Sequence, residues 1–343
     1  MKPILIVGAG FSGAVVARTL ADAGFSIDII DKRDHVAGNA FDYFNQYGIC
    51  VHKYGPHLFH TSNQKVVDWL SKFCDWVPYK HKVKALLQDG RYVTLPVNQE
   101  TSEIVGNDNI LDIFYRPYTK KMWGISLDQL DPAIINRVPI RSDMNEFYFP
   151  DDQFQALPSG GYTKLVEKII EHPNITLTLS KEFKKDIESN YFHVFNSMPI
   201  DEYFDFIFGR LPYRSIKFHH YDIPVPRVLP TATVNFTHSE KFTRVTEWKN
   251  LPSHGINNGF TSITIEEPCA YEENNYERYY PVKDAQGVNQ ELYKKYKNLT
   301  PKKVTFIGRC GLYAYLDMHQ AISVAKSVAE DFLTDQRYSI FGD

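Results

Sequence analysis

The fold is decided by residues 4–13, which read Ile4-Leu-Ile-Val-Gly8-Ala-Gly10-Phe-Ser-Gly13. An apolar run of strand type leads there into three glycines in G-x-G-x-x-G register. The segment from Ala14 to Ala23 then indicates a helix, and Ser26 to Ile30 a second strand. The first glycine of such a motif permits a tight turn, the second lets the backbone approach a pyrophosphate, and the third lets the helix pack on the strand.

Asp31 closes the second strand, 18 residues after Gly13, and is placed to accept a hydrogen bond from a ribose hydroxyl. The N-terminus of the helix offers free N–H groups and a positive dipole end to phosphates. A glycine turn without a ligand is the alternative, but strand, helix, second strand and acid follow in the order that a dinucleotide requires. The segment therefore predicts a dinucleotide-binding unit.

The polar stretch after Asp31 distinguishes FAD from NAD. It reads Lys32-Arg-Asp-His-Val-Ala-Gly38-Asn39-Ala and supplies another glycine close to the strand end. An acid, a basic residue and a later Ala-Gly pair resemble the extended fingerprint of FAD proteins, in which they line the ribose and the pyrophosphate. Because an NAD domain has no need of this second loop, we predict FAD.

The composition limits the partners and the location of this chain of 343 residues. A net charge of −3 and a pI near 6.5 argue against a nucleic-acid partner, which requires a basic surface. Four scattered cysteines without C-x-x-C spacing fit a reducing cytosol and predict no metal site. We expect a cytoplasmic protein without a signal peptide, since the first buried strand starts almost at once. No apolar run is long enough to predict a membrane span.

Changes of pattern along the chain predict where helices and strands lie. Residues 63–75 indicate an amphipathic helix, and residues 82–87 and 92–95 indicate a hairpin around Asp89-Gly90. Residues 101–136 are helical in composition, with breaks expected at Pro117 and Pro132. Strand-like segments dominate from Ile175 to Pro281. Residues 304–308 indicate another buried strand, and Asp317 to Leu333 a long final helix.

These elements predict an α/β protein whose nucleotide domain is discontinuous. The Rossmann-like FAD domain is expected to comprise residues 1–80, 158–212 and 299–343, because the last strand and helix return to it. A shortened helical domain covers residues 97–137. A β-sheet domain that contributes to the substrate site covers residues 81–96, 138–157 and 213–298.

One segment after the fingerprint is dense in polar and aromatic groups: Tyr54-Gly-Pro-His57-Leu58-Phe-His60-Thr. Alone it is explained equally well by a Gly-Pro turn with two solvated histidines. Together with the fingerprint it closely resembles the UDP-galactopyranose mutase family. The resemblance continues in family order at residues 118–124 (YTKKMWG), 137–141 (RVPIR), 148–149, 154–155, 158–163, 243–247 (TRVTE), 279–281 (YYP), 308–309 and 313–318.

The resemblance implies an isomerase that interconverts the pyranose and furanose forms of a nucleotide sugar, with UDP-galactose the first candidate. FAD would act in its reduced state, N5 attacking the anomeric carbon and forming a flavin–sugar adduct while UDP leaves. A reductant such as NAD(P)H would be needed. Relatives acting on dTDP-fucose or UDP-N-acetylgalactosamine remain alternatives. So do an amine-oxidase-like FAD oxidoreductase and a non-catalytic nucleotide-sugar-binding protein.

The resemblance also implies roles for individual residues. The positions matched to cofactor contacts are Gly8, Gly10, Phe11, Ser12, Gly13, Asp31, Lys32, Gly38, Asn39, His57, Leu58, Phe183, Arg309, Leu316, Asp317, Met318 and Ala321. Those matched to substrate contacts are His81, Phe114, Tyr118, Thr119, Trp123, Arg137, Tyr148, Asn235, Arg244, Tyr280 and Tyr315. The matched catalytic positions are Arg137, Arg244 and His60, with Arg137 on a loop that closes over the substrate.

Each role has a structural alternative. Aromatic residues at helical spacing between 114 and 123 are often core residues, the arginines could form surface ion pairs, and Asp317 is a good helix N-cap. The His219-His220 pair is interpreted as solvated. Two departures from the family pattern stand out: His81 replaces a usual asparagine, and the helical insert between Pro96 and Tyr118 is short. Since that insert commonly builds the dimer contact, we expect a monomer or an atypical oligomer.

Overall fold

The computed structural model describes residues 2–130, 139–256 and 258–341, with side chains up to residue 336. Its centre is a five-stranded parallel sheet in the order β10 (Ile175–Thr178), β2 (Ile27–Ile30), β1 (Ile4–Val7), β11 (Val194–Asn196) and β17 (Val304–Phe306). Strand β1 is buried along its length, as expected for a parallel strand between helical layers. The strands come from three separate parts of the sequence, which is the arrangement that the returning last strand predicted.

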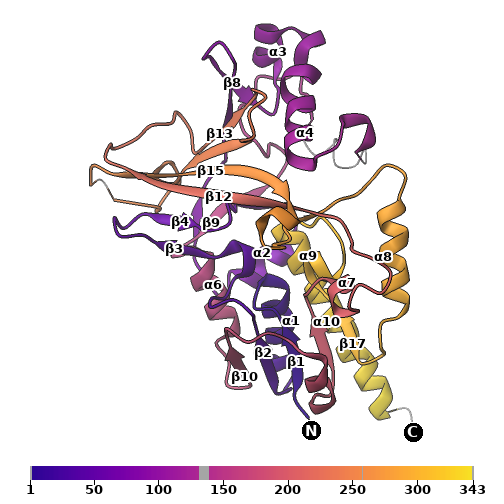
Figure 1. The fold of residues 1–343 in the computed structure, drawn as a ribbon. Helices are drawn as coiled ribbons and strands as arrows, with labels where there is room; N and C mark the ends of the chain where they lie inside the picture. Colours follow the sequence, from indigo (N-terminus) through magenta and orange to yellow (C-terminus); the bar gives the residue numbers. More distant parts are fainter. Residues whose placement is uncertain (1, 131–138, 257, 342–343) are drawn as a thin grey trace.

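Helix α1 (Phe11–Asp22) follows β1 and packs against the long C-terminal helix α10 (Met318–Phe341) in the lower half of the molecule (Figure 1). The prediction placed the start of α1 at Ala14. The helix begins earlier because Gly10 is its N-cap and the Ala14 N–H already bonds to the Gly10 carbonyl. The glycine loop and the helix start are therefore one turn, which brings the first helical N–H groups to the end of β1.

A seven-stranded mixed sheet crosses the upper half of the molecule (Figure 1). Its order is β16 (Tyr280–Pro281), β12 (Tyr213–Ile223), β15 (Thr261–Ala270), β14 (Arg244–Glu247), β13 (Thr233–Phe236), β7 (Val83–Leu86) and β8 (Tyr92–Leu95). Only the β13–β7 pair among these is parallel. The hairpin predicted around Asp89-Gly90 is confirmed as β7 and β8, with Val83 opposite Leu95.

Short elements join the two sheets. The small strands are β3 (Asp42–Phe44), β4 (Cys50–His52), β5 (Phe59–Thr61), β6 (Trp76–Pro78) and β9 (Phe154–Pro158). The remaining helices are α2 (Gln64–Leu70), α6 (Gly161–Ile170), α7 (Ile200–Tyr203), α8 (Val288–Asn298) and α9 (Gly308–Gly311). Turns of 3₁₀ helix lie at Gly38–Ala40, Asn107–Asn109, Leu127–Gln129, Lys185–Asn190, Trp248–Asn250 and Tyr271–Asn274.

The helical segment at the top of the molecule consists of α3 (Gln99–Val105), a π-helical turn at Leu111–Tyr115 and α4 (Arg116–Trp123). The expected break at Pro117 is wrong. Pro117 lies in the first turn of α4, where its missing N–H has no intrahelical partner to lose. The second expected break, Pro132, lies outside the described residues. Helix α4 ends at Gly124, whose φ of 71° is the left-handed conformation that glycine favours.

The predicted fold class is confirmed: the protein is α/β, with a Rossmann-like dinucleotide domain and further sheets. The exact division into three domains stays a prediction. Within the described residues, every helix is either too short or too polar to cross a membrane.

Candidate active site

A cavity of about 560 Å³ lies beside α4 and the strands β13 and β14, and reaches the start of α10. Many residues that the sequence predicted for the substrate side line it: His60, His81, Phe114, Tyr118, Thr119, Trp123, Tyr148, Asn235, Arg244, Tyr280 and Tyr315. Predicted cofactor residues His57, Leu58, Arg309, Asp317 and Met318 line the same cavity. The fold thus brings together segments that are far apart in the sequence. Arg137 lies outside the described residues.

The glycine fingerprint forms a tight loop at the carboxyl end of β1. A Cβ on Gly13 would lie 1.9 Å from the Gly8 carbonyl oxygen, so only glycine lets α1 approach the strand this closely. Gly10 faces Gly38, where an added Cβ would lie 3.2 Å from the Gly10 Cα. No side chain caps α1, and its first N–H groups, on Phe11 and Ser12, are available to a phosphate.

Asp31 ties this loop together from the end of β2. One carboxylate oxygen accepts from the Ala9 N–H at 2.7 Å and the other from the Arg33 N–H at 2.9 Å. Each oxygen keeps a second lone pair, so a ribose hydroxyl can still donate to it. The loop that carries Phe183 joins the same region, because Lys181 N–H donates to the Asp31 carbonyl. Phe183 was expected in a strand-like segment, but it lies in a loop after β10.

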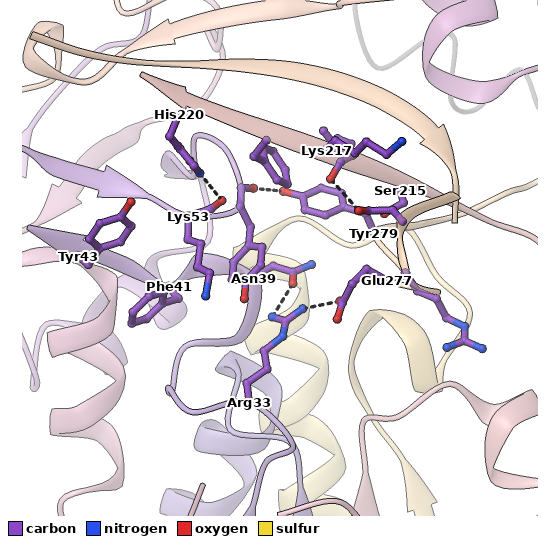
Figure 2. Close-up of a pocket in the computed structure, with 15 residues that line it drawn as sticks. Arg33, Asn39, Phe41, Tyr43, Lys53, Ser215, Lys217, His220, Glu277 and Tyr279 are labelled. Atoms are coloured by element: carbon purple, nitrogen blue, oxygen red, sulfur yellow. Dashed lines mark hydrogen bonds and ion pairs between the residues drawn. The ribbon is translucent and has the colours of Figure 1, made fainter. Parts of the chain in front are cut away.

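A second cavity, of about 620 Å³, lies between the loop after the fingerprint and β12 (Figure 2). The Arg33 guanidinium donates to Asn39 and to Glu277, both at 3.0 Å, and lies 4.4 Å from the centre of the Tyr54 ring. Lys32 reaches Glu277 at 4.0 Å. Because Arg33 and Asn39 belong to the loop that faces Gly10, this cavity adjoins the predicted pyrophosphate region.

The start of α10 and the Arg309 side chain both border the first cavity, the one beside α4, which is called the main cavity from here on. The guanidinium donates to the Leu316 carbonyl at 2.7 Å and to the Tyr279 carbonyl at 3.3 Å. The Asp317 N–H is capped by the Gln320 side chain at 2.9 Å, and Ala321 N–H bonds back to the Asp317 carbonyl. The Arg309 charge lies next to the positive end of α10, and the two together favour an anionic ligand there.

His57 lies in this part of the cavity as a neutral imidazole. Burial lowers its pKa to about 4, although a hydrogen bond to the Gly55 carbonyl opposes that shift. Since a carbonyl can only accept, Nδ1 carries the proton at 2.9 Å from the Gly55 oxygen. The Nε2 lone pair is therefore the free acceptor of the ring.

Arg244 is the partly buried cation of another wall of this cavity. Its Nε lies 2.9 Å from the Glu266 carboxylate, and one terminal nitrogen donates to the Tyr118 hydroxyl at 3.2 Å. The pair follows from sheet register, because Arg244 on β14 lies directly opposite Glu266 on β15. Burial raises the pKa of Glu266, while Arg244 lowers it. The glutamate orients the guanidinium and leaves its terminal nitrogens turned to the cavity.

Aromatic rings and hydroxyls complete this wall. The centre of the Tyr280 ring lies 4.8 Å from that of Tyr315 and 5.9 Å from that of Trp123. Burial raises the pKa of both Tyr148 and Tyr280, so their hydroxyls remain protonated donors at neutral pH. Asn235, opposite Arg244 in the sheet, has a buried side-chain oxygen without a partner. Cationic and hydroxyl donors thus converge on one space, an arrangement suited to a diphosphate.

His60 and His81 occupy the third side. His60 Nδ1 lies 2.6 Å from the Asp152 carboxylate, and its ring stacks on Phe149 with centroids 3.5 Å apart. Burial lowers the pKa of His81 to about 3, with Arg244 and His60 adding to that effect. The His81 Nδ1 lies 3.1 Å from the Tyr79 hydroxyl. His81 is thus a neutral polar group beside Arg244.

Comparisons with known proteins agree with this geometry. The family model of UDP-galactopyranose mutase matches residues 113–315, and a model of an NAD(P)-binding Rossmann-like domain matches residues 6–73. A probable UDP-galactopyranose mutase of Klebsiella pneumoniae is 34% identical over 97% of this chain and 95% of the relative. The chain belongs to the UDP-galactopyranose mutase family. The resemblance inferred from the motifs is confirmed, and with it the class of enzyme, an isomerase.

Family members with another named substrate are similar to a comparable degree. The dTDP-fucopyranose mutase of Escherichia coli is 30% identical over 98% of this chain and 100% of that protein. A solved structure of reduced UDP-galactopyranose mutase matches with a TM-score of 0.75 over 97% of this chain and 96% of that chain, at 16% identity. A putrescine oxidase structure matches with a TM-score of 0.57, at 14% identity, over 97% of this chain and 99% of that chain. These two likenesses show the fold.

The structure also identifies residues that the sequence reasoning did not select. Asp152 pairs with His60, Glu266 pairs with Arg244, and Tyr279 and His319 line the cavity. Tyr279 and His319 adjoin selected residues and could have been included on that ground. Asp152 and Glu266 carried no signal in the sequence, because their partners come from distant segments. Glu266 lies opposite Arg244 in the sheet, and Asp152 lies just before β9, which pairs with the strand of His60.

Within the described residues, one group of side chains lies close enough to hold a metal ion: Cys50, His52 and His254. Its hydrogen bonds argue against a metal. His254 Nδ1 donates to the Pro252 carbonyl, so its Nε2 is an acceptor at 2.9 Å from His52 Nε2. His52 Nδ1 accepts from the His57 N–H at 3.1 Å, so His52 Nε2 carries the proton. A metal would have to displace that proton from a fully buried imidazole. His219 is partly exposed and His220 is exposed, as expected for solvated side chains, and they also contact Glu267 and Thr264.

Proposed function

We propose that this protein is a flavin-dependent mutase that interconverts the pyranose and furanose forms of a nucleotide sugar, with UDP-galactose the first candidate. The observation that best supports this proposal is the set of residues that line the main cavity. Arg244 and the Tyr118 hydroxyl lie in one part of it, and Arg309, neutral His57 and the start of α10 lie in another, where Arg309 is 5.1 Å from the centre of the Tyr280 ring. The first part suits a nucleotide diphosphate and the second suits an isoalloxazine whose pyrimidine edge is negatively charged.

The described residues fit FAD. The Gly10–Gly38 approach leaves room only for backbone, the uncapped N–H groups of α1 can bind a pyrophosphate, and Asp31 can accept from a ribose. Phe183 and Lys32 would lie near the adenosine, and residues 316–321 would meet the flavin ring. In its reduced state FAD would supply a nucleophilic N5 that exchanges with the nucleotide at the anomeric carbon of the sugar.

The chain's own residues would bind and orient the nucleotide sugar and would exclude water from it. Arg244, held by Glu266, would bind the diphosphate through its terminal nitrogens. The Tyr148 and Tyr280 hydroxyls would donate to phosphate oxygens, and Phe114, Tyr118 and Trp123 would enclose the base. His60, paired with Asp152, would face the sugar. Arg137 would complete the clamp from its loop. The assignments other than that of Arg137 rest on position in the cavity and on the family match, and that of Arg137, which lies outside the described residues, rests on the family match alone.

The proposal also covers the cellular location, the reductant, the pathway and the domain division of the enzyme. We infer a cytoplasmic location, a reductant such as NAD(P)H, a role in galactofuranose-containing polysaccharide biosynthesis, and the three-part domain division given above. The E. coli relative named as a dTDP-fucopyranose mutase keeps dTDP-fucose as the alternative substrate, beside UDP-N-acetylgalactosamine. An amine-oxidase-like activity is disfavoured because the cavity contains a partly buried arginine and several hydroxyl donors rather than an apolar cage.

The test is turnover of three nucleotide sugars in both redox states, followed by chromatographic separation of substrate and product. We expect the dithionite-reduced protein to convert UDP-galactofuranose to UDP-galactopyranose without consuming reductant stoichiometrically. The oxidised protein should be nearly inactive. Preferential turnover of dTDP-fucose or UDP-N-acetylgalactosamine would change the substrate assigned to the protein, while its assignment as a nucleotide-sugar mutase would stand. Equal rates in both redox states would reject the flavin-dependent mechanism.

A further inference from the structure

Helix α4 is held in place at two points by cations. At its C-terminal end the Arg214 side chain, from β12, donates to the Met122 and Lys121 carbonyls at 2.8 and 3.0 Å. On its side the Lys121 ammonium contacts the turn between β13 and β14. These contacts connect α4, which carries Tyr118 and Trp123 of the cavity wall, to two different parts of the seven-stranded sheet.

The Lys121 ammonium donates hydrogen bonds to three backbone carbonyls. It donates to Phe236 at 3.0 Å, His238 at 2.9 Å and Phe242 at 3.0 Å. An ammonium has three N–H donors, so each donor has one acceptor. All three carbonyls lie in or next to the turn that connects Asn235 to Arg244, the two sheet residues that face the substrate space. The Lys121 side chain therefore connects the helix wall to the arginine wall, in addition to the hydrogen bond between Arg244 and the Tyr118 hydroxyl.

Partial burial disfavours the charged form of Lys121. Burial lowers the pKa of Lys121 to about 8, and no carboxylate contributes to the shift among the residues that the structure describes. A lysine pKa below its unfolded value means that the folded state binds the proton more weakly than the unfolded state does. The charged form thus lowers stability below pH 8, and the penalty is relieved as the pH rises from about 8 to 10.4.

We propose that Lys121 is a positioning residue that sets the distance between α4 and the β13–β14 turn, and with it the placement of Arg244 and Asn235 against the nucleotide. The proposal rests on the proposed function. It concerns nucleotide binding, so it can be tested on the oxidised protein without turnover.

The test compares Lys121→Met with Lys120→Met. Lys120 is the exposed neighbour on the same helix, so its substitution changes the same charge and has the same effect on helix propensity. We expect Lys121→Met to bind UDP about tenfold more weakly by calorimetry and to raise KM more than it lowers kcat in the reduced enzyme. Lys120→Met should behave as wild type. Lys121→Arg, which keeps a charged donor, should recover part of the affinity.

A double-mutant cycle with Arg244→Met tests whether Lys121 acts through Arg244. The two losses of UDP affinity should be markedly less than additive. Full additivity, unchanged UDP affinity in Lys121→Met, or a loss of stability with unchanged affinity of the folded protein would each overturn the proposal. If wild-type protein bound no UDP, the proposed function would fail first, which separates the two outcomes.

Discussion

Replacing Arg244 by Met should both weaken nucleotide binding and leave Glu266 buried without its partner. The Glu266 side chain is 3% exposed and that of Arg244 24%, and Nε lies 2.9 Å from the carboxylate. Breaking such a buried pair from one side costs about 3–5 kcal/mol. Protonation of the unpaired carboxylate can reduce this loss of stability. At pH 7, protonating a glutamate of ordinary pKa costs about 3.7 kcal/mol, which sets an upper limit on the penalty.

The pH dependence follows from the same reasoning. Burial already raises the folded-state pKa of Glu266 in the wild type, and without Arg244, which opposes that shift, the pKa rises further. Stability is therefore highest where Glu266 is protonated, at low pH, and is lost as the pH rises through the folded-state pKa. The penalty relative to wild type should be about 3 kcal/mol at pH 7. At pH 5 protonation costs only about 1 kcal/mol, so the difference should shrink to that size.

Urea unfolding of wild type, Arg244→Met and Arg244→Met/Glu266→Gln at both pH values measures these differences. The double variant removes the buried charge while keeping its volume, so it should recover most of the lost stability. Its UDP affinity should stay one to two decades below wild type, because the diphosphate still lacks a charge-assisted contact worth about 1.5–3 kcal/mol. An Arg244→Met protein as stable as wild type at pH 7, with no pH dependence of the difference, would refute this account of the pair.

Three further predictions concern the rest of the molecule. Arg137→Ala should lower activity or affinity by one to two decades and abolish the change in tryptophan fluorescence on adding UDP, and wild-type kinetics would exclude a role for that arginine. Gly13→Ala should yield protein without bound flavin, because the new Cβ would lie 1.9 Å from the Gly8 carbonyl oxygen; a yellow variant with a normal absorbance ratio would contradict this. Light scattering at micromolar concentration should show a monomer or a dimer that does not use residues 100–117, whereas a stable dimer with hydrogen-exchange protection confined to that segment would show the prediction wrong. The short segment offers too little apolar surface for a contact of roughly 1,200–2,000 Å².

The local features of this protein could be read from the sequence because each depends on neighbouring residues. The glycine spacing alone required the strand, turn and helix that the structure places at residues 4–22. The turn at Asp89-Gly90 likewise indicated the β7–β8 hairpin. Pro117 shows the limit of such reasoning. The residue is incompatible with a helix interior, but whether it interrupts a helix or begins one depended on the π-helical turn before it.

The partners of the candidate site were decided only by tertiary structure. The sequence supplied Arg244 and His60 as candidates, and the family motifs gave their roles. Glu266 reaches Arg244 through direct cross-strand pairing, and Asp152 reaches His60 from the segment just before β9, which pairs with β5. The Lys121 contacts likewise require α4 to cross the end of the β13–β14 turn. Local sequence patterns determine which helices, strands and turns form and which candidate side chains they carry. Strand register and helix crossing fix which buried charges meet, because they depend on how the whole core packs.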